Sequence, residues 1–366
     1  MLHCTTPSML RATEHRWISF PSEPNHPNSM TYALDPLHVL VTGASGLVGG
    51  AVITRLTREP GITVRAAYRA VPAHLPDGVR ATQTGNLGSE TEWQHAVRDI
   101  DVVIHCAARV HVMNDTEGDP LAAFRRANVD GTLQLARSAI AAGCRRFVFI
   151  SSIKVNGESS APGHPYTETM QPAPVDAYGQ SKLEAENALF ALATETGLEV
   201  VVIRPPLVYG PGVKANFRAM MRAVSRGIPL PLGWINNRRS LVAVDNLADL
   251  IALCTRHPAA ANEVFFAGDG EDVSSTELLR RVGKALGKPA RLLPVPVNWI
   301  IAVASLLGRQ PVANRLCGTL QVDIHKARSL LGWTPPLSLD DGLRRAAIAM
   351  NTRPGSQAHG HVEQDR

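Results

Sequence analysis

The segment LHVLVTGASGLVG, residues 37–49, decides the fold of this 366-residue chain. Its first six residues form an apolar run of the length of a buried strand, and the glycines after it predict a tight turn. Apolar residues then recur at helical spacing from Val48 to Leu56. A glycine turn between a strand and a helix lets a pyrophosphate approach the helix N-terminus. Because the spacing is G-x-x-G-x-x-G rather than G-x-G-x-x-G, a glycine turn without a ligand is the alternative. We predict that a dinucleotide contacts Gly43, Ser45, Gly46, Leu47, Val48 and Gly49.

Further strand-like runs follow at residues 62–67, 101–106, 146–151 and 199–204. They are rich in Val and Ile, as in strands covered on both faces of a parallel sheet. Helical segments such as 121–142 and 181–196 lie between them. This alternation predicts a doubly wound α/β fold, a Rossmann-like parallel sheet with right-handed crossovers.

Proline and glycine become frequent after Pro205-Pro206, and the elements shorten. We therefore expect a Rossmann domain at 37–205, with its sheet completed by parts of 240–268. A smaller C-terminal substrate lobe is expected at 206–240 and 269–345. The polar ends are expected to form a disordered N-terminal tail, residues 1–36, and a flexible C-terminal tail, residues 346–366.

Composition excludes several classes of protein. The chain carries 37 Lys and Arg against 32 Asp and Glu without a run of like charges, so we expect no nucleic-acid partner. Its 5 scattered cysteines predict reduced thiols, a cytoplasmic location and no metal site. The longest apolar stretch, 299–307, is about half of the ~20 residues that span a bilayer. We expect it to be a buried helix of the small lobe, with peripheral contact to a membrane or a lipid-linked substrate as the alternative.

Two motifs contain candidate catalytic residues. A spacing of four places Tyr178 and Lys182 on one face of a predicted helix, where an ammonium would stabilise a phenolate and lower its pKa. The pair therefore predicts a general base, and an ordinary helix-surface pair is the alternative. Ser151-Ser152 ends a strand at the edge where open α/β sheets bind ligands, so a serine there can hydrogen-bond a reacting oxygen. The alternative for the serines is turn chemistry.

The turn after the second strand distinguishes NAD from NADP. An acidic residue there would accept the ribose 2′-hydroxyl of NAD, whereas a basic residue would accommodate the 2′-phosphate of NADP. The chain has Ala67-Tyr68-Arg69 at this place, with no Asp or Glu in reach. We predict that Arg69 contacts the cofactor and that the enzyme prefers NADP or accepts both. A solvated surface arginine is the alternative.

Several motifs occur in the order typical of one enzyme family. Between residues 37 and 345 the chain resembles the extended short-chain dehydrogenases/reductases, and among them the NAD-dependent epimerase/dehydratase family. Segments 151–158 and 236–240 look closest to its O-antigen branch of 4-keto-6-deoxy-N-acetylhexosamine reductases and N-acetylglucosamine 4-epimerases. The motifs are the glycine turn, His105-Cys106-Ala107-Ala108, Asn128-Val129-Asp130-Gly131-Thr132, Ser151-Ser152, Tyr178 with Lys182, and Arg204-Pro205 with Val208-Tyr209-Gly210-Pro211-Gly212.

The resemblance implies a role for each matching residue. Tyr178 would be the general base and Lys182 would hold the ribose. Ser152 rather than Ser151 would be the catalytic hydroxyl, and Asn128 would be a supporting hydrogen bonder. Asn156 stands where the family usually has tyrosine, which is a departure from its pattern. The implied cofactor contacts are Asn86, Leu87, Ala107, Ala108, Tyr178 and Lys182, and the implied substrate contacts are Arg109, Lys154, Asn216 and Arg239.

The resemblance also implies the reaction: oxidation–reduction at C4 of a nucleotide-activated sugar for surface polysaccharide synthesis, by a homodimer. A 4,6-dehydratase is not expected, because Ile153 and Lys154 stand where such enzymes carry acidic residues. Since no acidic residue follows the second strand, a 4-keto reductase is slightly favoured. The alternative is a 4-epimerase of a UDP-sugar or of a lipid-diphosphate N-acetylglucosamine. A non-catalytic dinucleotide-binding sensor is the alternative of another class.

Overall fold

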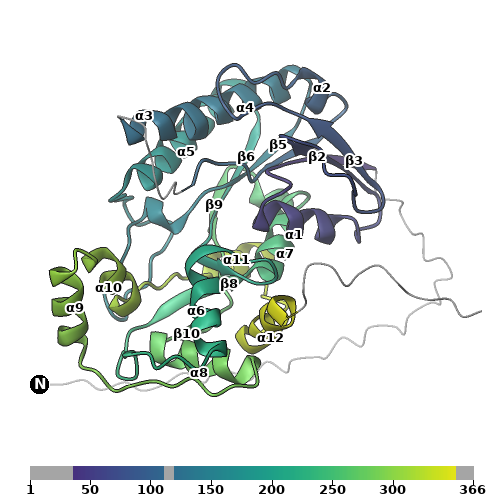
Figure 1. Ribbon diagram of the computed structural model, residues 1–366. Coiled ribbons are helices and arrows are strands. Elements are labelled where there is room, and N and C mark those ends of the chain that lie inside the picture. Colours follow the sequence, from purple (N-terminus) through teal and green to yellow (C-terminus); the bar gives the residue numbers. More distant parts are fainter. Residues whose placement is uncertain (1–35, 111–118, 352–366) are drawn as a thin grey trace, which may run out of the picture. The chain divides into compact units, whose positions relative to one another are not determined.

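The computed structural model describes residues 36–110 and 119–351, which contain a seven-stranded parallel sheet (Figure 1). The strand order is β3-β2-β1-β4-β5-β6-β9. This confirms the predicted Rossmann-like α/β fold. The tail expected at 1–36 lies, apart from Pro36, outside the described residues. The strands are β1 (Leu37–Thr42), β2 (Ile62–Tyr68), β3 (Val79–Gln83), β4 (Val102–His105), β5 (Arg146–Ile150), β6 (Glu199–Arg204) and β9 (Glu263–Phe266).

The two faces of the sheet contact different apolar cores. In β1, Val39 and Val41 belong to one core and Leu40 to the other, as the twofold period of a strand requires. Because both faces are covered, the strand sequences are almost continuously apolar. Helices α1 (Leu47–Leu56), α7 (Val244–Cys254) and α11 (His325–Leu331) cover the first face, and α2 (Gln94–Val97), α4 (Gly131–Ala141) and α5 (Ala177–Thr196) cover the second.

The helix expected at 121–142 contains one wider turn. Helix α3 (Pro120–Arg125) leads into a π-helical turn, η1 (Arg126–Asp130), and α4 follows directly. Such turns are rare and often lie at functional sites. Here the turn carries the buried Asn128.

Helix α5 starts at Ala177, earlier than the expected 181, because Asp176 Oδ1 caps it by accepting the Gly179 N–H at 2.7 Å. Tyr178 and Lys182 therefore lie in its first two turns. Short 3₁₀ turns, η2 (Ile153–Val155) and η3 (Pro258–Ala260), follow β5 and α7.

The smaller lobe has its own sheet and core. Strands β7 (Leu207–Tyr209), β8 (Arg239–Ala243) and β10 (Asp272–Val273) form a sheet of order β10-β8-β7. Its core is covered by α6 (Ala215–Ser225), α8 (Ser275–Ala285) and α12 (Leu339–Asn351). Since α12 buries Ala346 and Ala347 and runs to Asn351, the flexible tail expected from 346 begins too early; residues 352–366 lie outside the described part.

The expectation of a buried helix at 299–307 is wrong. Helix α9 (Val297–Leu306) and its neighbour α10 (Gln310–Cys317) form a hairpin at the edge of the small lobe, and α9 has no buried residue (Figure 1). Apolar composition predicted burial, but it does not say which element would cover the helix. No helix in the described part of the chain is long and apolar enough to cross a membrane.

Candidate active site

The glycine turn after β1 is too tight for side chains at two of its positions. Gly43 has φ +66°, and a Cβ there would lie 2.7 Å from the backbone nitrogen of Ala107. A Cβ on Gly49 would lie 2.3 Å from the carbonyl oxygen of Gly43. Helix α1 thus starts directly against the turn, with Gly46 as an N-cap that lacks a capping side chain. Its first N–H groups are available to an anion, which fits a dinucleotide pyrophosphate.

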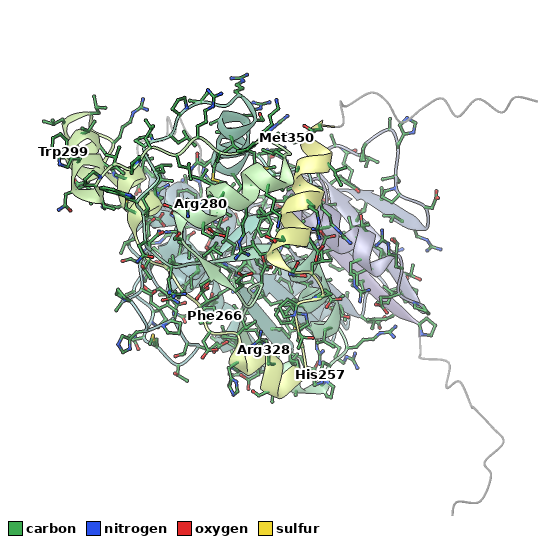
Figure 2. The ribbon with its side chains drawn as sticks, turned by 90° about the horizontal axis from the view of Figure 1, so that it is seen from below. His257, Phe266, Arg280, Trp299, Arg328 and Met350 are labelled. Carbon is green, nitrogen blue, oxygen red and sulfur yellow. The ribbon has the colours of Figure 1, made fainter. Side chains whose placement is uncertain are left out.

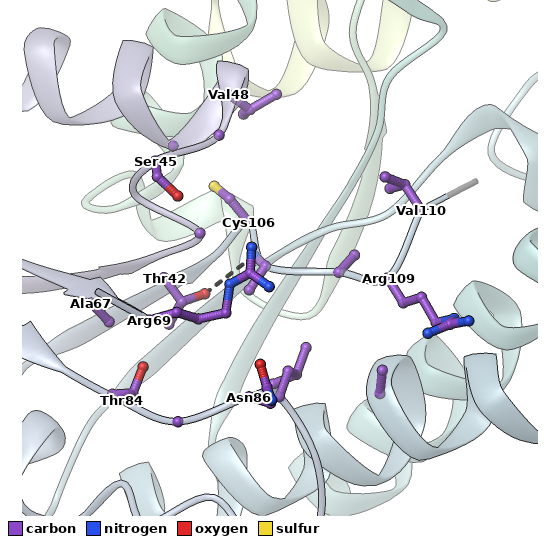
Figure 3. Close-up of a pocket in the computed structure, with 18 of the residues that line it drawn as sticks. Thr42, Ser45, Val48, Ala67, Arg69, Thr84, Asn86, Cys106, Arg109 and Val110 are labelled. Atoms are coloured by element: carbon purple, nitrogen blue, oxygen red, sulfur yellow. Dashed lines mark hydrogen bonds between the residues drawn. The ribbon is translucent and has the colours of Figure 1, made fainter. Parts of the chain in front are cut away.

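A cavity of 1160 Å³ opens beside this turn (Figure 3). Its size suits a ligand larger than a typical drug molecule, such as a dinucleotide. All predicted cofactor residues except Tyr178 and Lys182 line it: Gly43, Ser45, Gly46, Leu47, Val48, Gly49, Arg69, Asn86, Leu87, Ala107 and Ala108. The predicted substrate residue Arg109 lines it too. The sequence did not indicate Thr42, Trp93 or Arg126, which also line it, because no spacing links them to the glycine turn. Cys106 of the His105–Ala108 motif lines it as well.

The charged side chains in the described wall of the cavity are all basic. The described lining contains the arginines Arg69, Arg109 and Arg126 and no Asp or Glu. Arg69 follows β2, is exposed, and extends its guanidinium into the cavity (Figure 3). Such a wall attracts phosphate groups, and a free guanidinium fork can bind a phosphate through two hydrogen bonds.

The side chains of Tyr178 and Ser152 meet at the start of α5. The Ser152 hydroxyl caps η2 and hydrogen-bonds the Tyr178 phenol. The Tyr178 ring packs edge-on against Phe124, with centroids 6.0 Å apart. Arg109 from the cavity wall lies 5.8 Å above the Phe124 ring, so the phenol stands close to the end of the cavity.

The pKa of Tyr178 differs from the prediction. Burial and, to a smaller extent, the Asp176 carboxylate together raise it to about 12, while the Ser152 hydrogen bond opposes both. Lys182, which was expected to lower it, instead places its ammonium 4.0 Å from the centroid of the Phe149 ring. Lys182 is itself buried, which lowers its pKa to about 7 although Glu186 and Cys106 act in the opposite direction. The phenol therefore holds its proton at neutral pH.

Asn128 acts as a hydrogen bonder, as the resemblance implied. Its Oδ1 accepts the N–H of Arg109 at 2.8 Å, and its Nδ2 donates to the Arg109 carbonyl and to Ser181 Oγ, both at 3.0 Å. The π-helical turn thereby fixes the backbone of the cavity wall against α5, one residue before Lys182.

A buried polar chain continues from Asn128 towards the glycine turn. The Thr132 hydroxyl donates to the Asn128 carbonyl at 2.7 Å. His105 places Nε2 3.0 Å from Thr132 Oγ1 and Nδ1 2.7 Å from Thr42 Oγ1. Complete burial, with Lys182 nearby, lowers the pKa of His105 to about 3. The chain joins β1, β4 and η1 behind the cavity.

Ser151 has a structural role, which supports the choice of Ser152. The Ser151 hydroxyl donates to the buried carboxylate of Glu186. The same carboxylate forms an ion pair with Arg204, whose Nε lies 3.0 Å from Glu186 Oε1. Arg204 also donates to Asn156 Oδ1 at 3.0 Å, so the residue that departs from the family pattern is part of this network.

The remaining substrate residues are dispersed. Lys154 pairs with Glu158 and Asp176 and ties η2 to α5. Arg239 starts β8 and donates to the carbonyls of Arg315 and Gly318 at 2.8 and 3.1 Å, in the small lobe. Asn216 is exposed in α6 and does not line the cavity. Their contact with substrate stays a prediction.

Comparison with known proteins gives consistent results. A model of the NAD dependent epimerase/dehydratase family matches residues 39–268. A Vibrio cholerae protein named UDP-glucose 4-epimerase is 47% identical over 315 residues, covering 86% of this chain and 95% of that protein. An Escherichia coli O157:H7 protein named N-acetyl-alpha-D-glucosaminyl-diphospho-ditrans,octacis-undecaprenol 4-epimerase is 24% identical over 322 residues, covering 84% and 93%. The crystal structure of UDP-glucuronic acid 4-epimerase from Bacillus cereus in complex with NAD aligns with a TM-score of 0.70 at 22% identity, covering 86% of this chain and 96% of that one.

The sheet order, the glycine turn and the cavity define a Rossmann-type dinucleotide-binding protein. The chain belongs to the NAD dependent epimerase/dehydratase family. It is an enzyme of the nucleotide-sugar epimerase and dehydrogenase type, and its cofactor is NAD or NADP.

Proposed function

We propose that the protein is an NADPH-dependent 4-keto reductase that acts on a UDP-linked 4-keto-6-deoxy-N-acetylhexosamine. The observation that carries this proposal is the described cavity wall, which contains Arg69 after β2 and no carboxylate. A 2′-phosphate suits this wall, whereas the acidic partner of a tightly held NAD ribose does not occur in the described lining. A reductase must exchange its cofactor at every turnover, which fits a site without that partner.

The raised pKa of Tyr178 supports the reductive direction. Reduction of a ketone needs a protonated acid beside the carbonyl oxygen, and a phenol with a pKa of about 12 holds its proton at neutral pH. When bound, the nicotinamide would supply the hydride that reaches C4 of the sugar. Tyr178 would give its proton to the C4 oxygen, so the carbonyl becomes an alcohol. Ser152, already hydrogen-bonded to the phenol, would hold the same oxygen.

A UDP-sugar 4-epimerase is the second candidate, favoured by the 47% identical Vibrio cholerae protein of that name. The same residues would then remove hydrogen at C4 and return it to the opposite face, after the bound keto sugar has rotated in the site. The more distant Escherichia coli relative, named for a lipid-diphosphate sugar, extends this candidate to a lipid-linked substrate.

Mass spectrometry of the cofactor released from purified protein distinguishes the two candidates. It is combined with an NADPH-oxidation assay on the UDP-linked keto sugar. Protein that is free of cofactor and consumes NADPH with the keto sugar is the expected result. Stoichiometric bound NAD without NADPH consumption would leave the epimerase instead.

The role of Arg69 can be tested through cofactor preference. Arg69→Asp is expected to lower kcat/KM for NADPH by about 10–100-fold while leaving that for NADH within about threefold, because the 2′-phosphate loses its guanidinium and meets a like charge. Arg80→Asp is the control, since Arg80 is exposed in β3 and does not line the cavity. An equal decrease of kcat/KM for NADPH and NADH in Arg69→Asp would show that Arg69 does not bind the 2′-phosphate.

A further inference from the structure

The hairpin of α9 and α10 exposes apolar side chains in a regular pattern. Trp299, Val303, Leu306 and Leu307 are exposed to 70%, 52%, 87% and 68%. Their spacings of four, three and one place them on one side of α9 and its C-cap residue, Leu307. Figure 2 shows Trp299 at the outer edge of the molecule, and Figure 1 places α9 outside α10, so both views agree. Scattered apolar side chains are normal on a surface, but a helical face of four large ones indicates an interaction surface.

Helix α10 holds the hairpin to the small lobe. Ala313 of α10 is buried, and the carbonyl of Leu316 accepts hydrogen bonds from Ser275 Oγ and Asn237 Nδ2. Helix α9 packs on α10 and has no buried residue of its own. The apolar face of α9 is therefore presented outwards by a helix that is itself fixed.

Charge identifies the kind of surface that this face suits. From Val282 to Val322 the chain has no Asp or Glu and five basic residues, Lys284, Lys288, Arg291, Arg309 and Arg315. Arg309 and Arg315 are exposed on the hairpin itself. An apolar helix face with an aromatic residue and flanking arginines is the composition of helices that lie in the interface of an anionic membrane.

The length of α9 argues against a helix that spans a membrane, and the charge of the hairpin disfavours a contact between two copies. Helix α9 has 10 residues, about 15 Å at ~1.5 Å per residue and half of a bilayer's hydrocarbon thickness, so it would lie in the plane of the interface. A twofold contact between two copies would bring the arginines of both hairpins together without an acidic partner from this segment.

We propose that the α9–α10 hairpin docks the enzyme peripherally on an anionic phospholipid surface. The side chains of Trp299, Val303, Leu306 and Leu307 enter the acyl-chain boundary, and Arg309 and Arg315 meet the lipid phosphates. This docking does not depend on which sugar the enzyme reduces or epimerises.

Flotation of the full-length protein with vesicles tests the proposal. Wild-type protein is expected to float with vesicles of phosphatidylcholine containing about one-third phosphatidylglycerol, and only weakly with phosphatidylcholine alone. The double variant Leu306→Gln/Leu307→Gln is expected to lower the partition coefficient by roughly tenfold or more, because two leucines leave the apolar phase. Leu330→Gln is the control, since Leu330 is exposed in α11, outside the hairpin.

Two further measurements keep the outcome clear. Brominated lipids should quench Trp299 fluorescence in wild-type protein, and the quenching should be lost in Trp299→Phe. Light scattering reports the oligomeric state of each variant. Wild-type protein that stays unbound, or a double variant that floats as well as wild type, would overturn the proposal. A double variant that changes only from dimer to monomer would show that a second copy covers the face instead.

Discussion

Replacing Tyr178 by phenylalanine is expected to lower kcat by about a thousandfold or more while changing the Kd for the cofactor by less than about threefold. The ring stays in place because its packing against Phe124 involves only carbon. What is lost is the hydroxyl that Ser152 contacts and that holds the transferable proton. Steady-state kinetics with the UDP-linked keto sugar and a fluorescence titration with NADPH measure the two quantities.

Tyr166→Phe is the matched control for this prediction. The Tyr166 hydroxyl donates to the Ser159 carbonyl at 2.6 Å and does not line the cavity, so its removal should leave kcat within about threefold. If Tyr178→Phe retained more than about a tenth of wild-type activity, another group would have to supply the proton.

Substituting glutamine for Glu186 is expected to lower the free energy of unfolding by about 3–5 kcal/mol. Glu186 and Arg204 are both buried, and the carboxylate also accepts from Ser151. A neutral amide leaves the Arg204 guanidinium as an uncompensated charge between β6 and α5. Denaturant unfolding, compared at constant m-value, measures the change.

Glu184→Gln provides the control, two residues away in the same helix. Glu184 pairs with Arg125 at the surface, and such exposed pairs contribute less than about 1 kcal/mol. Equal losses for Glu184→Gln and Glu186→Gln would mean that burial of the Glu186 pair adds nothing to stability.

The sequence predicted those parts of the fold and site that depend on local pattern. The glycine turn, each buried strand and the Tyr178–Lys182 spacing depend on residues close together in the chain, where periodicity and glycine placement are sufficient. Arg69 was also predicted, because the residue after the second strand has a fixed place at the edge of the sheet.

The rest depends on contacts between distant segments. Asn128 makes its contacts from the π-helical turn, and no residue pattern in the sequence predicts such a turn. Lys154 appeared free for substrate, yet Asp176, 22 residues later, pairs with it. The exposed face of α9 could not be predicted either, because an apolar helix has the same sequence whether or not another element covers it.

His105 has a consequence for the site that follows from the direction of its hydrogen bonds. The Thr132 hydroxyl uses its one proton for the Asn128 carbonyl, so its oxygen can only accept, and the imidazole must carry its proton on Nε2. Nδ1 is then bare and accepts from Thr42. The ring is thus locked in one neutral tautomer, and its two ¹⁵N resonances should stay unlike and constant between about pH 5 and 8, where a free histidine titrates. Histidine is usually associated with acid–base switching, but His105 stays neutral here and holds Thr42 and Thr132 in fixed positions over this pH range.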